Sequence, residues 1–322
     1  MNLPLAPIPE LDALSTELES AITIGGVLSG ELKVVSRQAN EFYSTFPSEV
    51  ITCRFDGKRE IRLFCKYSAD LDHEAHGHRG GVVYEAEVYR QLLQDLDLSS
   101  PTLYGVYREA ANNRVGLVLE YLADNARVTK TFDSEAMDKA ARWIGRFHAL
   151  CSTRVSSSEL SFLRRYDPDY YKGWASRTRH MAEQSGSCPR WLRTACDRFD
   201  EVIEALCDTH PTIIHGEYYP NNILLQNGLI HPVDWESTAI GSGEIDLATL
   251  TEGWDQGSIQ RLILEYQRAR WLEGPPHDFH ERLCAARIYI QFRWLGDRAD
   301  WTPYLQPRLE VLREHAEEMG LI

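Results

Sequence analysis

The sequence lacks any long apolar segment. Across its 322 residues, no apolar run approaches the roughly 20 residues that a membrane-spanning helix needs. The first 20 residues, MNLPLAPIPELDALSTELES, also lack the basic start and apolar core of a signal peptide. These absences predict a cytoplasmic protein with no membrane partner.

Cysteines are few and follow no pattern. There are seven, an odd number, and no two of them have CxxC spacing. Such cysteines are typical of reduced thiols in a cytosolic protein and do not indicate a disulfide framework.

Basic residues are outnumbered by acidic ones. The chain has 34 Lys and Arg against 48 Asp and Glu, a formal net charge of −14. This balance argues against a nucleic-acid partner, because phosphates bind basic surfaces. It is compatible with a cationic small substrate, although net charge alone is a weak indication of any partner. The remaining composition, 43% hydrophobic and 25% charged, is that of an ordinary globular protein with one large domain or two modest ones.

The first third of the chain is dominated by strand patterns. Leu11, Leu14, Leu18 and Ile22 have helical spacing and predict one N-terminal helix. Strands are expected over residues 32–35, 49–55, 61–67, 103–108 and 115–122. Because the second and third of these alternate in polarity, the pattern predicts an antiparallel meander.

A long loop is expected over residues 36–49, between the first two strands. Loops of this length within a hairpin are uncommon unless they have a function. It carries Asn40, Ser44 and Thr45, and its backbone N–H groups could face phosphates. It contains no glycine, so it is not a Gly-rich phosphate loop, and a plain surface connection is an equal alternative.

Lys66 lies near the end of the third strand, in an apolar stretch. Alone it would be interpreted as an exposed lysine of an edge strand. The next segment, residues 80–94, has a helical pattern and carries Glu85 and Glu87, carboxylates that could hold Lys66 in place. An ammonium fixed by a carboxylate is suited to gripping phosphates.

Three histidines precede that helix, at His73, His76 and His78. Their HxxHxH spacing would allow a metal site. The surrounding glycines and charges instead favour a solvated loop.

Composition becomes helix-rich after about Asp124, which is therefore the expected domain boundary. Helices are predicted over residues 134–150 with Ser134 as N-cap, over 191–207, and around the apolar sets that begin at Ile259, Leu283 and Leu305. His148 falls on the apolar face of the first of these helices and is expected to be a satisfied core histidine.

Residues 211–246 combine short apolar runs with polar loops. The Asn227-Gly228 pair predicts a hairpin with a type I′ turn, which needs positive φ at both residues. The open end of this hairpin would gather Asn222 and Asp234, with Glu217 just upstream, provided that the chain leaves the ladder near Pro232. Three oxygen-bearing side chains are what Mg²⁺ requires.

Each of these residues also has a simpler interpretation when taken alone. Asn222 and Asp234 would be ordinary turn residues about half the time. His215 is expected to support the loop fold, and Asp246 is expected to accept backbone N–H bonds.

Together these segments resemble the aminoglycoside phosphotransferase / choline kinase-like branch of the protein-kinase-like fold. The family signature is His-Gly-Asp, four residues, Asn, and a later Asp that often occurs as Asp-Trp-Glu. It is matched by His215-Gly216-Glu217, by Asn222 and by Asp234-Trp235-Glu236. Residues 241–248 resemble the Gly-x-x-x-x-Asp-Leu-Ala tail of the family, and the likeness spans about residues 30–250.

The resemblance implies an α+β, bilobal fold. A small antiparallel-sheet N-lobe, residues 1–123, would bind the nucleotide. A larger, mostly helical C-lobe, residues 124–322, would carry the catalytic loop, the metal site and the acceptor-binding helices.

The resemblance also implies a nucleotide site for ATP or another nucleoside triphosphate. Lys66 matches the lysine that contacts the phosphates, and Glu85 matches its paired helix glutamate better than Glu87 does. Ser44 and Thr45 fall in the phosphate loop. The hinge that takes adenine on its backbone corresponds to Glu120, Tyr121 and Leu122.

By the same resemblance, Asn222 and Asp234 hold Mg²⁺. Glu217 orients the acceptor hydroxyl and accepts its proton, although the family has aspartate there. The extra methylene moves the carboxylate by about 1 Å, a shift that can cost of order 100-fold in rate. Either the loop is rebuilt for Glu, or the acceptor sits differently, or phosphotransfer has been lost. Since the lysine, its glutamate and the metal pair are retained, an active enzyme is favoured.

The function expected is that of an ATP- and Mg²⁺-dependent phosphotransferase acting on a hydroxyl of a small molecule such as an aminoglycoside, a sugar or an amino alcohol. The alternatives are a peptide or protein Ser/Thr kinase on the same fold, and a non-catalytic nucleotide-binding pseudokinase. Four carboxylates could bind a cationic acceptor or simply form a solvated face: Asp167, Asp169, Glu252 and Asp255.

Overall fold

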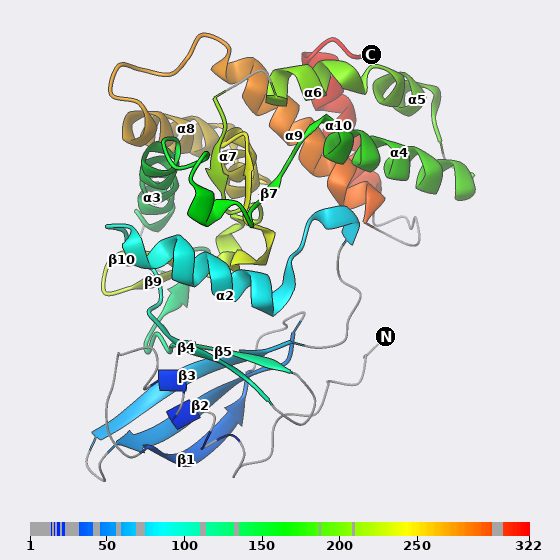
Figure 1. Ribbon diagram of the computed structural model, residues 1–322. Helices are drawn as coiled ribbons and strands as arrows, with labels where there is room; N and C mark the ends of the chain where they lie inside the picture. Colours follow the sequence, from blue (N-terminus) through cyan, green and yellow to red (C-terminus); the bar gives the residue numbers. More distant parts are fainter. Residues whose placement is uncertain are drawn as a thin grey trace. The chain divides into compact units, whose positions relative to one another are not determined.

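A computed structural model of the chain describes most of its residues (Figure 1). The described part comprises residues 14, 16, 18, 19, 21, 22, 32–40, 46–55, 59–68, 75–109, 114–131, 135–186, 188–207, 210–297 and 305–322.

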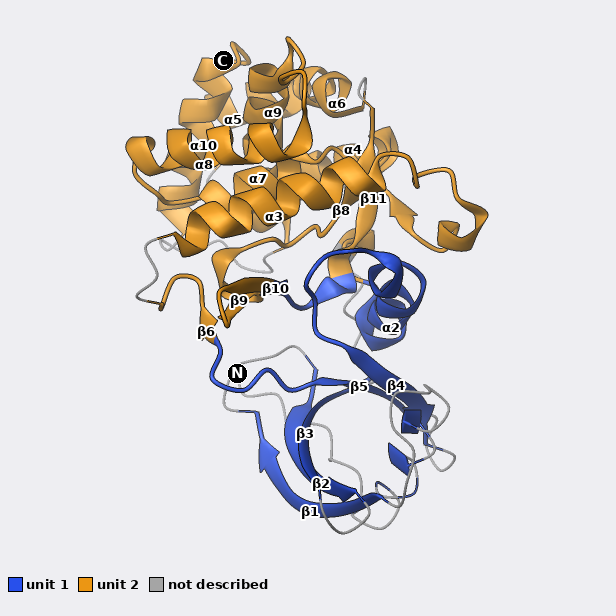
Figure 2. Cartoon of the chain, turned by 90° about the vertical axis from the view of Figure 1, so that its left-hand side faces the viewer, with its two compact units in different colours: residues 1–74, 80–125, 231–236 blue, residues 75–79, 126–230, 237–322 orange. Residues whose placement is uncertain are grey.

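The chain divides into two compact units, coloured separately in Figure 2. The first, here called the sheet unit, comprises residues 1–74, 80–125 and 231–236. The second, called the helical unit, comprises residues 75–79, 126–230 and 237–322. Two short segments therefore belong to a different unit from their neighbours in the sequence, and one of them, 231–236, carries Asp234.

The sheet unit is built on one antiparallel sheet of five strands. They are β1 Leu32–Ala39, β2 Ser48–Phe55, β3 Arg59–Tyr67, β4 Leu103–Arg108 and β5 Val115–Glu120. Their order is β1-β2-β3-β5-β4, so the predicted meander of the first three strands is confirmed. Alternation along the strands buries Ile51, Cys53 and Leu63 in one core together with the helical residues Leu14 and Leu18.

The first strand is longer than its sequence predicts. The expected loop over 36–49 is wrong at its start, because residues 36–39 continue β1 and pair with residues 49–52. This polar end of the strand has no apolar alternation to reveal it. A bidentate ion pair stabilises it, since Arg37 donates from Nε at 2.7 Å and from Nη2 at 2.6 Å to the buried Glu49. Ser44 and Thr45, which were predicted to lie in the phosphate loop, are outside the described part of the chain.

The helix α2, Gly81–Gln91, belongs to the same unit. It buries Val82, Ala86 and Tyr89, which share one helical face. It ends three residues before the predicted end at 94, and a single 3-10 turn, Leu93–Asp95, follows it.

The helical unit contains eight longer helices among its described residues. They are α3 Ala136–Cys151, α4 Pro168–Gln184, α5 Arg190–Asp197, α6 Phe199–Cys207, α7 Glu244–Thr251, α8 Gln256–Arg270, α9 Phe279–Gly296 and α10 Gln306–Glu318. Helix α9 packs against α4, α6, α7 and α10, while α3 and α8 lie side by side (Figure 1). Being surrounded in this way, α9 is buried along most of its length.

Short strands connect these helices. One small sheet joins β7 Arg164–Arg165, β11 Ala239–Gly241 and β8 Thr212–Ile214; the other joins β10 Leu229–Pro232, β9 Ile223–Gln226 and β6 Ala126–Arg127. They place the polar loops of residues 215–222 and 233–238 at strand ends. None of the helices in the described ranges is long and apolar enough to cross a membrane.

Two helix predictions in this unit need correction. The single helix expected over 191–207 is two, α5 and α6, and the break comes at Arg198, which donates to the carbonyl of Gly320 at 2.6 Å and to Glu201. Its apolar spacing runs unbroken through the two helices, so periodicity could not reveal the break. Helix α4 was not predicted, because it buries aromatic side chains such as Tyr171 and Trp174. The expected N-cap Ser134 lies outside the described residues.

Candidate functional site

The predicted hairpin is present with its type I′ turn. Asn227 and Gly228 have φ values of 50° and 80°, and they separate β9 from β10. Strand β10 ends at Pro232, and Asp234 has a φ of 69°. The chain therefore leaves the ladder where the missing N–H of Pro232 predicts it should.

The backbone of the loop that carries Glu217 is held by the side chain of Asp246. Its Oδ2 accepts the backbone N–H of His215 at 2.7 Å, and its Oδ1 accepts that of Gly216 at 2.9 Å. His148 Nε2 lies 3.0 Å from Oδ2, and His148 Nδ1 lies 2.9 Å from the hydroxyl of Tyr266. These contacts confirm that Asp246 organises the loop and that His148 is a satisfied core histidine.

Gly216 is required by the shape of this loop. Its φ is 83°, a conformation that favours glycine. A Cβ at this position would lie 2.2 Å from the carbonyl oxygen of Ser237. The close approach of two backbone segments thus leaves room only for hydrogen.

In the sheet unit, Lys66 is held by three carboxylates. Its Nζ lies 2.7 Å from Oε2 of Glu85, 2.6 Å from Oδ1 of Asp234 and 3.9 Å from Oε2 of Glu236. Glu85 also accepts the backbone N–H of Trp235 at 3.2 Å, whereas Glu87 contacts Arg90 on the outside of α2. Of the two carboxylates considered for Lys66, the structure therefore pairs it with Glu85.

Burial and charge oppose each other in this cluster. Burial lowers the pKa of Lys66, but Asp234, Glu85 and Glu236 outweigh it and hold that pKa well above its usual value. Burial raises the pKa of Glu85, and the ammonium of Lys66 opposes this rise. Lys66 and Glu85 are 5% and 1% exposed, while the side chain of Asp234 is 37% exposed. Three carboxylates therefore face a single cation, and Asp234 is the most accessible of the three. Their oxygen atoms form a donor set that fits a divalent metal ion.

In the helical unit, Glu217 is surrounded by side-chain nitrogens, two of which, from Arg293 and Arg79, donate to it. Its Oε1 lies 2.9 Å from Nη1 of Arg293, 3.3 Å from Nε2 of His78 and 3.4 Å from Nη2 of Arg79. Among the described residues, no side chain or backbone group donates to its other oxygen, Oε2. Glu217 is only 7% exposed. Burial raises its pKa, but His78, Arg293 and Arg79 outweigh burial and hold that pKa well below its usual value.

The interpretation of the histidine segment as a solvated loop is wrong for His78, which is 2% exposed. Its Nδ1 lies 2.9 Å from the hydroxyl of Tyr166 and 3.2 Å from that of Tyr170. His76 is exposed, and His73 lies outside the described residues. Sequence reasoning missed His78 and Arg293 as neighbours of Glu217, since no local pattern relates positions so far apart in the chain.

Asn222 ends the 3-10 turn Pro220–Asn222, immediately before β9. Its Nδ2 donates to the backbone carbonyl of Glu217 at 3.0 Å. The amide nitrogen is thereby engaged within the loop, and the amide oxygen is the atom suited to a cation. Asn222 belongs to the helical unit and Asp234 to the sheet unit.

Of the three expected hinge residues, Glu120 is the last residue of β5, and Tyr121 and Leu122 follow it, so the strand ends two residues before the predicted end at 122. Glu120 accepts the N–H and the hydroxyl of Thr102 at 3.1 and 2.9 Å. The guanidinium of Arg62 lies 4.0 Å from the ring centroid of Tyr121. Leu122 is buried, so the side chains of this segment are fixed by local contacts.

Three of the four carboxylates considered for a cationic acceptor have structural partners. Asp167 and Asp255 are the N-caps of α4 and α8. Glu252 accepts from Arg308 and from Gln291, both at 2.9 Å. The fourth, Asp169, lies in the first turn of α4. The first three therefore have structural roles, which the sequence did not predict.

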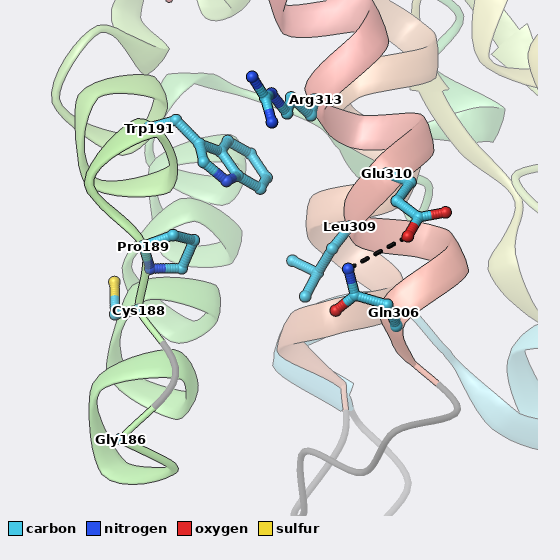
Figure 3. Close-up of a pocket in the computed structure, with 8 residues that line it drawn as sticks. All are labelled: Gly186, Cys188, Pro189, Trp191, Gln306, Leu309, Glu310 and Arg313. Atoms are coloured by element: carbon cyan, nitrogen blue, oxygen red, sulfur yellow. Dashed lines mark hydrogen bonds between the residues drawn. The ribbon is translucent and has the colours of Figure 1, made fainter.

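A pocket of about 540 Å³ lies in the helical unit between α5 and α10. Figure 3 shows Trp191 pointing across it toward Leu309 and Arg313, and Gln306 donating to Glu310 at 3.2 Å. None of the residues predicted for catalysis, metal or nucleotide binding lines this pocket.

The fold and the two charged clusters define a kinase-like phosphotransferase. Residues 72–278, more than half of the chain, match the model of the phosphotransferase enzyme family, APH. The chain belongs to this family, and its predicted resemblance and enzyme class are confirmed. A search of curated proteins found no match.

Solved structures with a similar fold include three small-molecule kinases. A spectinomycin phosphotransferase in complex with ADP and spectinomycin has a TM-score of 0.60 at 12% identity, covering 98% of this chain and 100% of its own. A microcompartment-associated aminopropanol kinase has a TM-score of 0.64 at 14% identity, covering 97% and 99%. A choline/ethanolamine kinase family protein from Mesorhizobium loti has a TM-score of 0.61 at 14% identity, covering 96% of each chain. The predicted α+β, kinase-like fold, with an antiparallel-sheet N-terminal region and a helical C-terminal region, is confirmed.

Proposed function

We propose that this protein transfers a phosphoryl group from ATP, with Mg²⁺, to a hydroxyl group of a small molecule. The observation that carries the proposal is the buried Lys66, placed between Glu85 and Asp234 at 2.7 and 2.6 Å. A fixed ammonium next to a partly exposed carboxylate can bind the phosphates of a metal–nucleotide complex. The sheet unit would thus bind the nucleotide, and the hinge at 120–122 would take its base.

In this proposal Asp234 and Asn222 are the metal ligands. A bound Mg²⁺ would supply neutralisation of phosphate charge, and the residues of this chain supply the rest. Lys66 orients the phosphates. Glu217 orients the acceptor hydroxyl and accepts its proton. Because phosphoryl transfer needs mainly positioning and electrostatic stabilisation, these few groups are sufficient.

The small-molecule class of acceptor is supported by the similar structures. Their names give spectinomycin, aminopropanol and choline or ethanolamine as substrates of those proteins. All of these carry a hydroxyl group, and they are not peptides. A hydroxylated small molecule is therefore the acceptor class that we propose, in preference to a protein Ser/Thr residue.

A non-catalytic nucleotide-binding protein is the second candidate. It is favoured by the guanidinium groups of Arg293 and Arg79 at Glu217, because a carboxylate with a strongly lowered pKa is a weak base. It predicts that Mg·ATP stabilises the protein but that no acceptor is phosphorylated.

The test is an ATP-consumption screen over aminoglycosides, sugars, amino alcohols and other hydroxylated metabolites. The purified protein should consume ATP with at least one of them, and EDTA should abolish the reaction. Asp234→Asn should reduce turnover by about 100-fold or more, by loss of charge stabilisation at the metal. Asp255→Asn, which preserves a helix N-cap, is the matched control.

Two results would contradict parts of this proposal. Activity that survives in Asp234→Asn would remove the metal assignment. Stabilisation by Mg·ATP without transfer to any acceptor would favour the non-catalytic candidate.

A further inference from the structure

The three nitrogen groups around Glu217 all approach the same carboxylate oxygen. Nη1 of Arg293, Nε2 of His78 and Nη2 of Arg79 lie 2.9, 3.3 and 3.4 Å from Oε1. We propose that Arg293, oriented by His78, is a positioning residue that fixes Glu217 through Oε1, so that Oε2 is the oxygen that receives the acceptor hydroxyl. This inference rests on the proposed function, since it assigns roles around the same general base.

Arg293 is suited to restrain a side chain that is one methylene longer than aspartate. It projects from α9, the helix that packs against α4, α6, α7 and α10, and it is itself buried. Its Nη2 donates to the hydroxyl of Tyr219, which also accepts from Nε1 of Trp294 at 2.8 Å. A guanidinium fixed at both of its ends removes the extra torsional freedom of Glu217.

His78 is neutral and orients this guanidinium by accepting a hydrogen bond from it. A guanidinium nitrogen can only donate, so the hydrogen bond between Nη1 of Arg293 and Nε2 of His78 requires a lone pair on Nε2. The proton then lies on Nδ1, which donates to Tyr166 at 2.9 Å. Tyr170, which also approaches Nδ1, lies 2.7 Å from the hydroxyl of Tyr289. His78 is thus fixed by Tyr166, which follows β7, and by Tyr170 of α4, whose hydroxyl also contacts Tyr289 of α9.

The arrangement explains how glutamate can replace the aspartate of the family. The longer side chain reaches a buried cation that anchors one oxygen, and the other oxygen stays free for the acceptor. Reverting Glu217 to aspartate should therefore impair the enzyme, because the shorter carboxylate withdraws by about 1 Å from Arg293. A protein in which Glu217 merely substitutes for aspartate would gain activity from the same change.

The experiment compares Arg293→Lys, Glu217→Asp, His78→Gln and the double variant Glu217→Asp/Arg293→Lys. Turnover is measured with Mg·ATP and the acceptor found in the screen, and also with water as acceptor. We expect Arg293→Lys to lower kcat by about tenfold or more and Glu217→Asp by about 100-fold, with the KM for ATP unchanged within about twofold. The double variant should be no worse than the poorer single variant, because both changes break the same contact.

Three further variants distinguish a positioning role from a purely structural one. Arg268→Lys, at an exposed arginine of α8, is the matched control and should retain full turnover. Arg293→Met leaves the buried carboxylate with only the more distant guanidinium of Arg79 among the described cationic groups and is expected to fold poorly, so it is made together with Glu217→Gln, which removes both charges. His78→Gln keeps an acceptor for Arg293 and should retain more activity than His78→Phe.

The outcomes separate this inference from the proposed function. If wild type transfers no phosphoryl group to any acceptor, water included, the proposed function fails and the positioning role fails with it. If wild type is active and Arg293→Lys matches it, or Glu217→Asp equals or exceeds wild type, only the positioning role is overturned. A loss confined to KM for ATP would likewise overturn it.

Discussion

The burial of a neutral histidine beside an arginine has a consequence for stability at low pH. Burial, and then the charge of Arg293, lower the pKa of His78 from 6.5 to about 4. Between these values the unfolded chain binds a proton that the folded chain does not. The contribution of His78 is therefore complete above pH 6.5 and is lost as the pH falls toward 4.

The expected loss is about 3 kcal/mol in the free energy of unfolding, from about 1.4 kcal/mol for each unit of pKa shift. Urea unfolding at pH 7, 6, 5 and 4 measures it. Other histidines also contribute to the slope, so the difference between wild type and His78→Gln isolates this residue. The same substitution at the exposed His210 is the control, and equal slopes for wild type and His78→Gln would contradict the expectation.

At this scale the sequence could identify the residues with a local signature. Lys66 on its strand, Glu85 or Glu87 on the next helix, and Asn222 and Asp234 at the hairpin could be singled out when taken together, and the family resemblance favoured Glu85 over Glu87. Arg293 could not, because it contacts Glu217 and His78 across 76 and 215 positions of the chain. A buried arginine on a helix gives no signal of which carboxylate it will meet.

At the scale of elements, the backbone of residues 215 and 216 is held closely by its neighbours. Asp246 accepts the N–H groups of His215 and Gly216, and the carbonyl of Ser237 lies so close to Gly216 that a Cβ there would clash with it. The hairpin glycine Gly228 has nearly the same φ, 80°, but a Cβ there would meet nothing within 4 Å. Substituting Gly228 therefore tests the free-energy cost of the left-handed conformation alone, whereas substituting Gly216 adds the cost of a steric clash.

Gly228→Ala should lower the free energy of unfolding by about 1 to 2 kcal/mol, the cost of a left-handed residue with a Cβ. Gly216→Ala should cost clearly more, about 3 kcal/mol or above, because the backbone must also move. Urea unfolding of both variants gives the comparison. Equal costs would mean that the loop yields easily and is not held as the contacts indicate.

The elements also show where pattern reasoning succeeds. A strand with regular alternation, such as β2, and the turn at Asn227-Gly228 follow from local chemistry. The end of β1 could not be predicted, since residues 36–39 have no apolar alternation and are held by their pairing with residues 49–52 and by the ion pair of Arg37 with Glu49. Helix α4 was missed because aromatic burial gives no aliphatic period, although Asp167 followed by Pro168 is a helix-start signal.

At the scale of the molecule, each of the two units has its own buried cysteines. Cys53 and Cys65 are fully buried in the sheet unit, and Cys151 is fully buried in the helical unit. All seven cysteines are free thiols, and Cys207 is exposed. Thiol labelling can therefore report the opening of each unit separately.

The sheet unit is the smaller of the two, so it buries a smaller fraction of its surface on folding. It also carries Lys66, Glu85 and Glu236 in its interior, charges whose burial is costly even when paired. We therefore expect Cys53 and Cys65 to become reactive at a lower urea concentration than Cys151. Mass spectrometry after pulsed labelling identifies each site, and Cys207, reactive without urea, is the internal control.

Adding Mg·ATP tests whether the nucleotide acts on the unit that we assign to it. A ligand stabilises the state that binds it, by about 2.7 kcal/mol at 100 times its Kd. The urea midpoint for Cys53 and Cys65 should then rise toward that of Cys151, and Asp234→Asn should remove most of the rise. If all buried cysteines react at one urea concentration with and without nucleotide, the chain unfolds as a single cooperative body. If Mg·ATP protects Cys151 alone, nucleotide binding belongs to the helical unit and the assignment of the sheet unit is wrong.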